Sequence, residues 1–177
     1  MKSTDEQNAK SRRSRRPETV ILFIVAHQMF AISADSVQEL RSTDSLAGAA
    51  IEIEQPEFPK VRHTIERSHQ TYYVVNAGVH FHLPVTRPAL VLILRQLRAA
   101  VLVDRIERMA EISGVYPLPQ AFTGEERSWY RGLAYLDDVV IPVVHPAGFL
   151  SPEEFHRLDR ATKASVLQSE MESAVQS

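Results

Sequence analysis

One local pattern occurs twice in the chain, with starting points about seventy residues apart. Each copy has an apolar run, a short polar turn, a second apolar run, and a short segment that mixes acidic and apolar residues. The first copy spans residues 20–40 and the second spans residues 90–109. Similarity at a fixed spacing indicates one structural unit used twice, and two copies are too few for a solenoid. We therefore expect two related all-β halves packed together, which favours a binding module over an enzyme.

The composition limits the class of protein. A chain of 177 residues suits one domain, or two small subdomains that share an interface. An apolar fraction of 44% excludes wholesale disorder, and 20 Lys plus Arg against 22 Asp plus Glu gives no charge that points to nucleic acid or a membrane. The absence of cysteine removes disulfides, thiolate catalysis and cysteine-based metal sites. The longest apolar runs have six or seven residues, too short for a membrane span or a secretory signal, so we expect a cytoplasmic protein without membrane insertion.

The two ends of the chain differ from its centre. Residues 1–18 are polar and carry four arginines, which predicts a disordered basic arm. The arm either contacts phosphates, for example those of a nucleic acid, or an acidic partner, or it is a solvated tail, and the solvated tail is favoured. At the other end, Ser151 to Glu154 have the order of an N-cap, a first-turn proline and a capping box. A helix should therefore begin there and dock through Phe155 and Leu158, with a helix end and tail over residues 161–177.

Two strands are expected just before the second copy of the repeat. Residues 72–75 and 79–83 are rich in valine and aromatic residues, and they flank Asn76 to Gly78, which favours a tight turn. Because side chains alternate along a strand, His80 and His82 should lie on one face of the second strand.

Two further strand elements are expected outside this region. Ile51 and Ile53 alternate with glutamates, which predicts a short edge strand within an otherwise irregular stretch. Residues 129–144 predict a late hairpin, with its turn at Asp137 and Asp138. Adjacent carboxylates in a turn point apart, so this pair indicates a turn rather than acid–base catalysis.

The sequence offers little that indicates catalysis. It has only six glycines and contains no glycine-rich phosphate loop, no His-Glu-x-x-His helix and no Gly-x-Ser-x-Gly elbow. His80 and His82 could bind zinc if His63 or His69 supplied a third ligand, so a metal-dependent enzyme or a metal sensor is an alternative hypothesis. A polar strand edge is the favoured interpretation of these histidines. We therefore expect no catalytic residue, no metal and no cofactor.

Four segments, taken in order, carry a resemblance to a known family. The first hairpin ends in Ser36 to Arg41, and the second hairpin leads into Val103 to Ile106. The late hairpin includes Arg131 to Val143, and a helix follows Phe149 to Ser151. This order resembles the CheW-like family, the chemotaxis coupling proteins that link chemoreceptors to the histidine kinase CheA. The resemblance covers about residues 19–160.

The resemblance implies a fold and a function. The fold would be all-β with short helices: two small five-stranded β-barrel subdomains that share a core, followed by a C-terminal helix. The chain would divide into the basic arm (1–18), a CheW-like domain of two intertwined barrels (19–160), and the helix end and tail (161–177). The function would be that of a noncatalytic adaptor or scaffold in chemotaxis or a related chemosensory pathway.

The resemblance also implies protein partners. A chemoreceptor cytoplasmic tip would bind between the barrels, and the regulatory domain of a CheA-type histidine kinase would bind a barrel end. The partner-binding residues implied are Val37, Glu39, Leu40, Asn76 and Gly78. The chain departs from the family's central N-L-R-G-x-x-x-P-V-V-D-L motif, because Asn76, Gly78 and Pro84 match but the arginine is absent. Loss of an interface arginine removes a charge-assisted contact, so function is expected to have diverged within residues 41–85.

Overall fold

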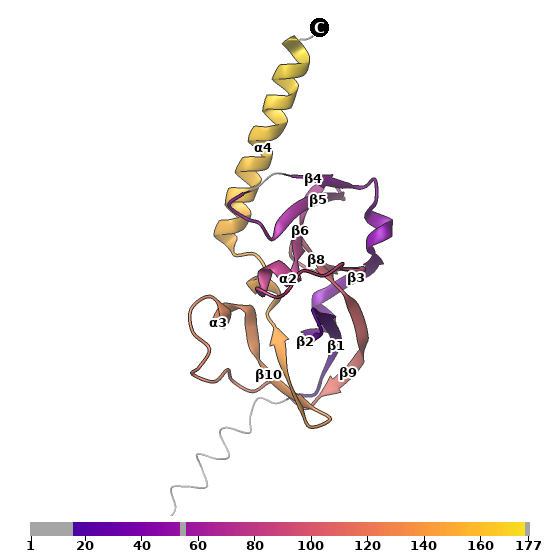
Figure 1. Cartoon of the computed structure of the whole chain (residues 1–177), viewed down its shortest axis with the longest axis vertical. Helices are drawn as coiled ribbons and strands as arrows, with labels where there is room; N and C mark the ends of the chain where they lie inside the picture. The colour runs from indigo at the N-terminus through magenta and orange to yellow at the C-terminus, as the bar shows by residue number, and fades with distance from the viewer. Residues whose placement is uncertain (1–15, 54–55, 176–177) are drawn as a thin grey trace, which may run out of the picture.

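The computed structural model describes residues 16–53 and 56–175, so most of the expected basic arm lies outside the described residues. Figure 1 shows a β domain from which one long helix projects. None of the described helices has the length and apolar character needed to cross a membrane. The elements in chain order are β1 (Glu18–Val25), β2 (Gln28–Ser33), η1 (Ala34–Ser36), β3 (Val37–Ser42), η2 (Thr43–Leu46), β4 (Ala50–Glu52), β5 (Val61–Arg67), β6 (Gln70–Asn76), α2 (Ala77–His80), β7 (Leu90–Leu94), β8 (Ala99–Val103), β9 (Arg105–Ile112), α3 (Glu126–Trp129), β10 (Tyr130–Leu136), β11 (Val139–Val144), η3 (Pro146–Gly148) and α4 (Pro152–Val175).

The described strands form two sheets with the same internal plan. The first sheet has the order β10-β11-β2-β1-β9, and the second has the order β3-β7-β8-β6-β5-β4. In each sheet the repeat hairpin pairs in parallel with one strand of a second hairpin, β2 with β11 of the later hairpin β10–β11 and β8 with β6 of the earlier hairpin β5–β6. The sheets therefore match strand for strand, and the short β4 is the one addition. The expected all-β fold with a C-terminal helix is confirmed.

The repeat units exchange strands. The hairpin β1–β2 belongs to the first sheet, but β3, which follows it, pairs with β7 in the second sheet. The hairpin β7–β8 belongs to the second sheet, and β9, which follows it, pairs with β1 in the first. The segment after each hairpin is thus a strand that completes the other sheet.

Three apolar clusters explain why the repeat strands lack alternation. One cluster contains only residues of the first sheet and of the segment that follows β9, and another contains only residues of the second sheet and η2. The largest cluster, which we call the shared core, takes side chains from both sheets and from α4. Consecutive residues of one strand therefore enter different clusters: Val91 and Ile93 lie in the second-sheet cluster, whereas Leu92 and Leu94 lie in the shared core. A strand buried on both faces has a continuous apolar sequence.

The first turn of α4 has the expected capping box. The Ser151 amide donates to Glu154 Oε2 at 2.7 Å, and the Glu154 amide donates to Ser151 Oγ at 3.1 Å. Leu158 is fully buried in the shared core, and Phe155 packs against it. Asp159 accepts a hydrogen bond from the Tyr73 hydroxyl at 2.6 Å and is bound in a bidentate manner by Arg98. These contacts attach the first three turns of α4 to the second sheet.

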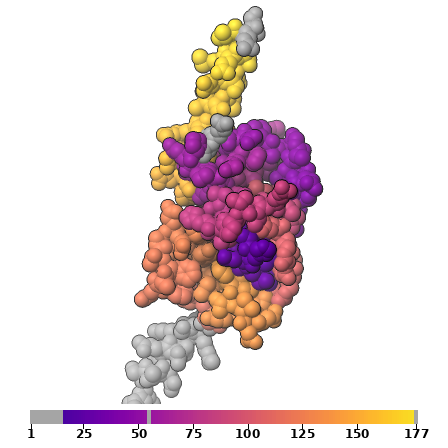
Figure 2. All heavy atoms as spheres, in the orientation of Figure 1, coloured from indigo at the N-terminus to yellow at the C-terminus, as the bar shows by residue number. Residues whose placement is uncertain are grey.

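The rest of α4 leaves the β domain. The region expected to be a helix end and tail is helical as far as Val175, and its side chains beyond Thr162 are exposed. Figure 2 shows this part of the helix standing clear of the remaining atoms.

The hairpin turns have left-handed backbone at residues other than glycine. Both turn residues have positive φ in the β5–β6 turn (Ser68 and His69) and in the β10–β11 turn (Asp137 and Asp138). The turn expected at the two aspartates is confirmed. Such φ values suit glycine or asparagine in two-residue hairpin turns and cost other residues conformational energy.

The β5–β6 turn provides a test of this strain. His69 has φ of 63°, so His69→Gly should raise the free energy of unfolding by about 0.5–1 kcal/mol. Urea denaturation with linear extrapolation measures the change. Gln70→Gly, one residue further on within β6, is the matched control and should lower the free energy of unfolding by about 0.5–1 kcal/mol. A destabilised His69→Gly variant would show that this turn is not strained.

Candidate protein-binding surfaces

Three of the residues implied by the resemblance lie on β3, an edge strand of the second sheet. Val37 is buried in the shared core, with 9% of its surface exposed. A register shift in the β3–β7 pairing separates Val37 from Glu39, as at a β-bulge. Leu40 is 48% exposed. Glu39 and Leu40 are therefore accessible to a partner, whereas Val37 acts by packing.

Glu39 forms an ion pair that joins two distant parts of the second sheet. Its carboxylate contacts the Arg41 guanidinium on the same strand and Arg67 Nη1, at the end of β5, at 2.7 Å. Hydrogen bonds from Arg41 and then from Arg67 lower the pKa of Glu39 below its usual value. The carboxylate is therefore charged at neutral pH and is flanked by two cations.

Asn76 is partly exposed and Gly78 is buried, and both residues hold α2 in place. The Asn76 side chain is the N-cap of α2 and accepts a hydrogen bond from the Val79 amide at 3.1 Å. Gly78 is buried, and a Cβ there would lie 3.2 Å from Asn76 Oδ1 and 3.7 Å from the Val25 side chain. Both residues therefore fix the start of α2 and its contact with β1.

The structure separates these five residues into two groups. In the second sheet, β7 and β8 lie between β3 and β6, so Asn76 does not lie on a strand that pairs with β3. In the strand register Arg41 pairs with Val91, Val91 pairs with Leu102, and Leu102 pairs with Asn76. Of the five residues, Glu39 and Leu40 alone form an exposed pair.

The strand expected over residues 79–83 was wrong. Ala77–His80 is a helical turn that ends with the amide of His82 bonded to the Val79 carbonyl and the amide of Leu83 bonded to the Gly78 carbonyl. This is a Schellman ending, with His82 in left-handed backbone at φ 55°. As a result His80 points into the core, with 4% of its surface exposed, while His82 is exposed.

The histidine metal site is therefore not formed in the described part of the chain. His80 is buried and His82 is exposed, and no three His, Asp or Glu side chains of the described residues are grouped closely enough to hold a metal ion. His80 is instead surrounded by rings, with centroid distances of 4.8 Å to Trp129, 4.9 Å to Phe81 and 5.1 Å to Phe149. Trp129 thus belongs to the shared core, with 6% of its surface exposed.

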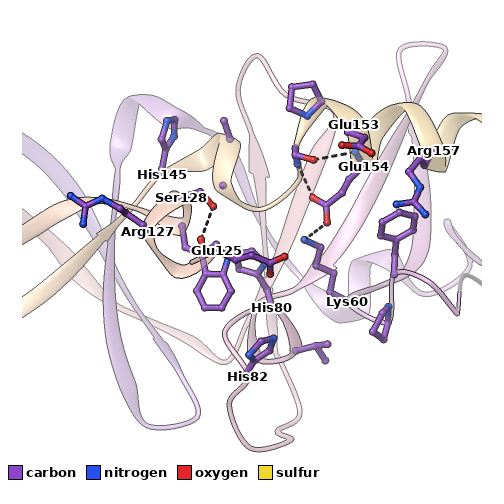
Figure 3. A pocket seen from close by; sticks show the side chains of 18 of the residues that line it. Lys60, His80, His82, Glu125, Arg127, Ser128, His145, Glu153, Glu154 and Arg157 are labelled. Atoms are coloured by element: carbon purple, nitrogen blue, oxygen red, sulfur yellow. Dashed lines mark hydrogen bonds and ion pairs between the residues drawn. The ribbon is translucent and has the colours of Figure 1, made fainter. Parts of the chain in front are cut away.

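His80 lies at the edge of a pocket between α2, α3 and the start of α4. Figure 3 shows the labelled side chains around this pocket, which has a volume of about 780 Å³. The wall carries both signs of charge, and the Lys60–Glu154 ion pair crosses it at 2.8 Å. His80 Nε2 is buried without a hydrogen-bond partner, and burial, followed by the charges of Lys60 and His82, lowers the pKa of His80 to about 3. A neutral imidazole held by rings stabilises packing and is poorly suited to proton transfer at neutral pH.

The first sheet has a counterpart of the Glu39 ion pair. Arg108 Nη2 on β9 contacts Asp137 Oδ2, in the β10–β11 turn, at 2.6 Å. By the shared strand plan, β9 is equivalent to β3, and the β10–β11 turn is equivalent to the β5–β6 turn beside Arg67. The two ion pairs occupy equivalent places with opposite polarity, because the acid is on β3 in one sheet and the base is on β9 in the other.

An exposed apolar side chain follows each of these charges. Leu40 follows Glu39 and is 48% exposed, and Met109 follows Arg108 and is 60% exposed. Surfaces that bind other proteins combine an apolar centre with a polar rim. The repeat that defines the fold therefore also duplicates a surface.

The first sheet adds a further apolar surface that the sequence did not reveal. Tyr135 and Val140 are cross-strand partners on β10 and β11, so they share a face of the sheet, and each is about half exposed. We call these two residues the hairpin patch. Tyr116 packs edge-on against Tyr135, with ring centroids 4.9 Å apart, which holds the ring in place. Adjacent exposed apolar side chains indicate an interaction site more strongly than scattered ones do.

Two interlocked sheets, with charged and apolar side chains exposed at equivalent edges, define a β domain with surfaces suited to protein contact. A family model, the CheW-like domain, matches residues 19–154, and the chain belongs to this family. The crystal structure of the scaffolding protein TtCheW from Thermoanaerobacter tengcongensis is similar, with a TM-score of 0.64 and 17% sequence identity over 78% of this chain and 96% of that chain. A search of curated proteins found no match. The expected family and fold are confirmed.

The burial of His80 predicts a loss of stability in acid. The unfolded imidazole binds a proton near its ordinary pKa of 6.5, whereas the folded one does so near 3, so unfolding takes up a proton within this window. The free energy of unfolding should therefore fall by about 2 kcal/mol between pH 7 and pH 5 on account of His80. Urea titrations at both pH values measure the difference within each variant.

Two variants isolate the contribution of His80. His80→Phe should lose most of this pH dependence, even if its stability at pH 7 changes. His82→Asn, at an exposed neighbour, should keep it. Equal pH dependence in the parent protein and His80→Phe would contradict a neutral buried imidazole.

Proposed function

We propose that the protein is a noncatalytic scaffold that links the cytoplasmic tip of a chemoreceptor to the regulatory domain of a CheA-type histidine kinase in a chemosensory pathway. Membership of the CheW-like family supports this proposal, and so does the similarity of the fold to that of a scaffolding protein. The observation that carries it is the pair of exposed surfaces at equivalent edges of the two sheets. A scaffold needs two surfaces that two partners can occupy together.

We assign the receptor to the β3 surface. Glu39 and Leu40 are accessible there, and Arg41 and Arg67 lie on either side of the carboxylate. The central motif lacks the family's arginine, but these two guanidinium groups place positive charge beside Glu39. Val37, Asn76 and Gly78 act indirectly, because Val37 packs β3 against the shared core and the other two residues fix α2.

We assign the kinase regulatory domain to the first sheet. The β10–β11 hairpin, which carries the hairpin patch, extends to the end of the β domain far from α4 (Figure 1), and Arg108 and Met109 lie on the edge strand β9. Aromatic and apolar side chains that become fully desolvated carry most of the free energy of a protein interface. The hairpin patch supplies such side chains, and the Arg108–Asp137 pair supplies polar contacts at its edge.

The receptor assignment predicts the effect of a single charge. Glu39→Gln should weaken binding to a receptor cytoplasmic tip about tenfold, or about 1.4 kcal/mol, because a charge-assisted contact is lost. Isothermal titration calorimetry with the purified receptor tip measures the affinity. Folding stability should change by less than about 1 kcal/mol, since the ion pair is partly exposed. Binding to the kinase regulatory domain should be unchanged, and a receptor affinity equal to that of the parent would refute the assignment.

The kinase assignment predicts the reciprocal result. Val140→Glu buries a charge at the hairpin patch and should weaken binding to the kinase regulatory domain at least about tenfold. Arg108→Gln, the structural counterpart of Glu39→Gln, should weaken it less. Neither variant should alter receptor binding, so the two sets of variants are controls for each other. Loss of both partners in every variant would indicate damage to the fold, which the far-ultraviolet circular dichroism spectrum would reveal.

A further inference from the structure

The outer part of α4 is a helix without support. The helix has 24 residues, which corresponds to about 36 Å. Leu158 is its one fully buried residue, and side chains from Lys163 to Val175 are exposed. A short helix in water is only marginally stable, since helices gain most of their stability from packing an apolar face. We therefore expect the outer part of α4 to pack against something other than the β domain of its own chain.

An apolar stripe runs along this outer part. Ala164, Leu167, Met171 and Ala174 follow one another at intervals of three, four and three residues, the spacing of a coiled-coil seam. Leu167 is 60% exposed and Met171 is 71% exposed. At 3.6 residues per turn the stripe lies on the side of the helix opposite Leu158. Its partner therefore approaches from the side that the β domain leaves open.

The same stripe continues toward the base of α4 into a groove. Arg157 and Arg160 extend the three–four spacing in the N-terminal direction. The groove has a volume of about 450 Å³ and is lined by Pro56, Glu57, Phe58, Arg157, Arg160 and Ala161. The Arg157 guanidinium lies over the Phe58 ring at 5.1 Å and pairs with Glu57 at 2.6 Å. An apolar side chain that enters the groove meets the Phe58 ring and the arginine stems.

Basic and acidic residues are distributed unevenly along the length of α4. The base of the stripe is basic, with Arg157, Arg160 and Lys163, whereas the tip carries Glu170 and Glu172. Two such helices in parallel would place like charges together, and in antiparallel orientation they place acid beside base. We propose that α4 pairs antiparallel with α4 of a second copy of this chain. This proposal is independent of the proposed function, because it uses neither the β3 surface nor the hairpin patch.

One register of the two antiparallel helices fits both the apolar stripe and the charges. With Ala164 of each copy opposite Leu167 of the other, a small side chain faces a large one in both layers. Lys163 then lies beside Glu170 of the second copy, and Met171 reaches the base groove of the second copy at Arg160. The overlap covers residues 157–174, or about 27 Å of helix. The contact is self-complementary, as a twofold dimer requires, and both β domains lie outside the helix pair.

Sedimentation equilibrium of the full chain over a range of micromolar concentrations tests the association. The parent should be a concentration-dependent dimer. Leu167→Glu should be a monomer over the same range, because it places a charge in the seam. Val166→Glu, at the adjacent residue on another side of the helix, is the matched control and should dimerise like the parent. A monomeric parent, or equal loss in both variants, would overturn the proposal.

The orientation has its own test, which the absence of cysteine makes simple. In a mixture of Ala164→Cys and Leu167→Cys chains, oxidation should join one chain of each kind, because these positions face each other only in the antiparallel pair. Preferential linkage of identical chains would show a parallel pair and refute the register. Glu170→Lys should raise the dimer dissociation constant about fivefold, and the double variant Lys163→Glu/Glu170→Lys should restore it. Failure of the double variant to restore dimerisation would remove the charge argument for this register.

Discussion

Exchange of strands between the two halves is the constraint on which the rest of the structure depends. Neither repeat unit completes a sheet with its own residues, because β3 pairs with β7 and β9 pairs with β1. The hairpin strands are therefore covered on both faces, by the cluster of their own sheet and by the shared core. Burial on two faces excludes alternation from their sequence, which is why the six-residue apolar run at Val20 to Val25 is required. The halves must fold together, and this fixes the spacing between their surfaces.

Much of this architecture could be predicted from the sequence where local chemistry determined it. The repeat, the two hairpins, the turn at the two aspartates and the capping box at Ser151 and Glu154 all depend on neighbouring residues. The exchange of β3 and β9 could not be predicted in this way, because pairing with a distant strand leaves no local pattern. Strand β5 was missed for a related reason: a register shift near Val61 interrupts its alternation, so that Val61, Thr64 and Ile65 are the buried positions.

The error at residues 79–83 has a specific cause. Val79, Phe81 and Leu83 alternate with two histidines, which is the period of a strand. Two local hydrogen-bond arrangements prevail over that period: the Asn76 side chain caps a helical turn, and the amides of His82 and Leu83 close it. The helix ends without a glycine, at a histidine with positive φ, so the usual C-terminal signal is missing. The consequence for function is direct, because His80 moves from a surface face into the aromatic core.

The candidate surfaces depend on contacts that no single stretch of sequence shows. In the sequence Glu39 looks like an isolated surface charge, but in the structure its carboxylate binds Arg67, which is 28 residues away. Arg108 likewise binds Asp137, which is 29 residues away. The two pairs stand at equivalent positions of a duplicated unit, yet their polarity is reversed, so one partner surface cannot complement both sites. A duplicated surface that has exchanged acid for base presents a different charge pattern at each of its two copies. The proposed scaffold function would use this difference to hold two partners, and the difference arises from the same repeat that builds the fold.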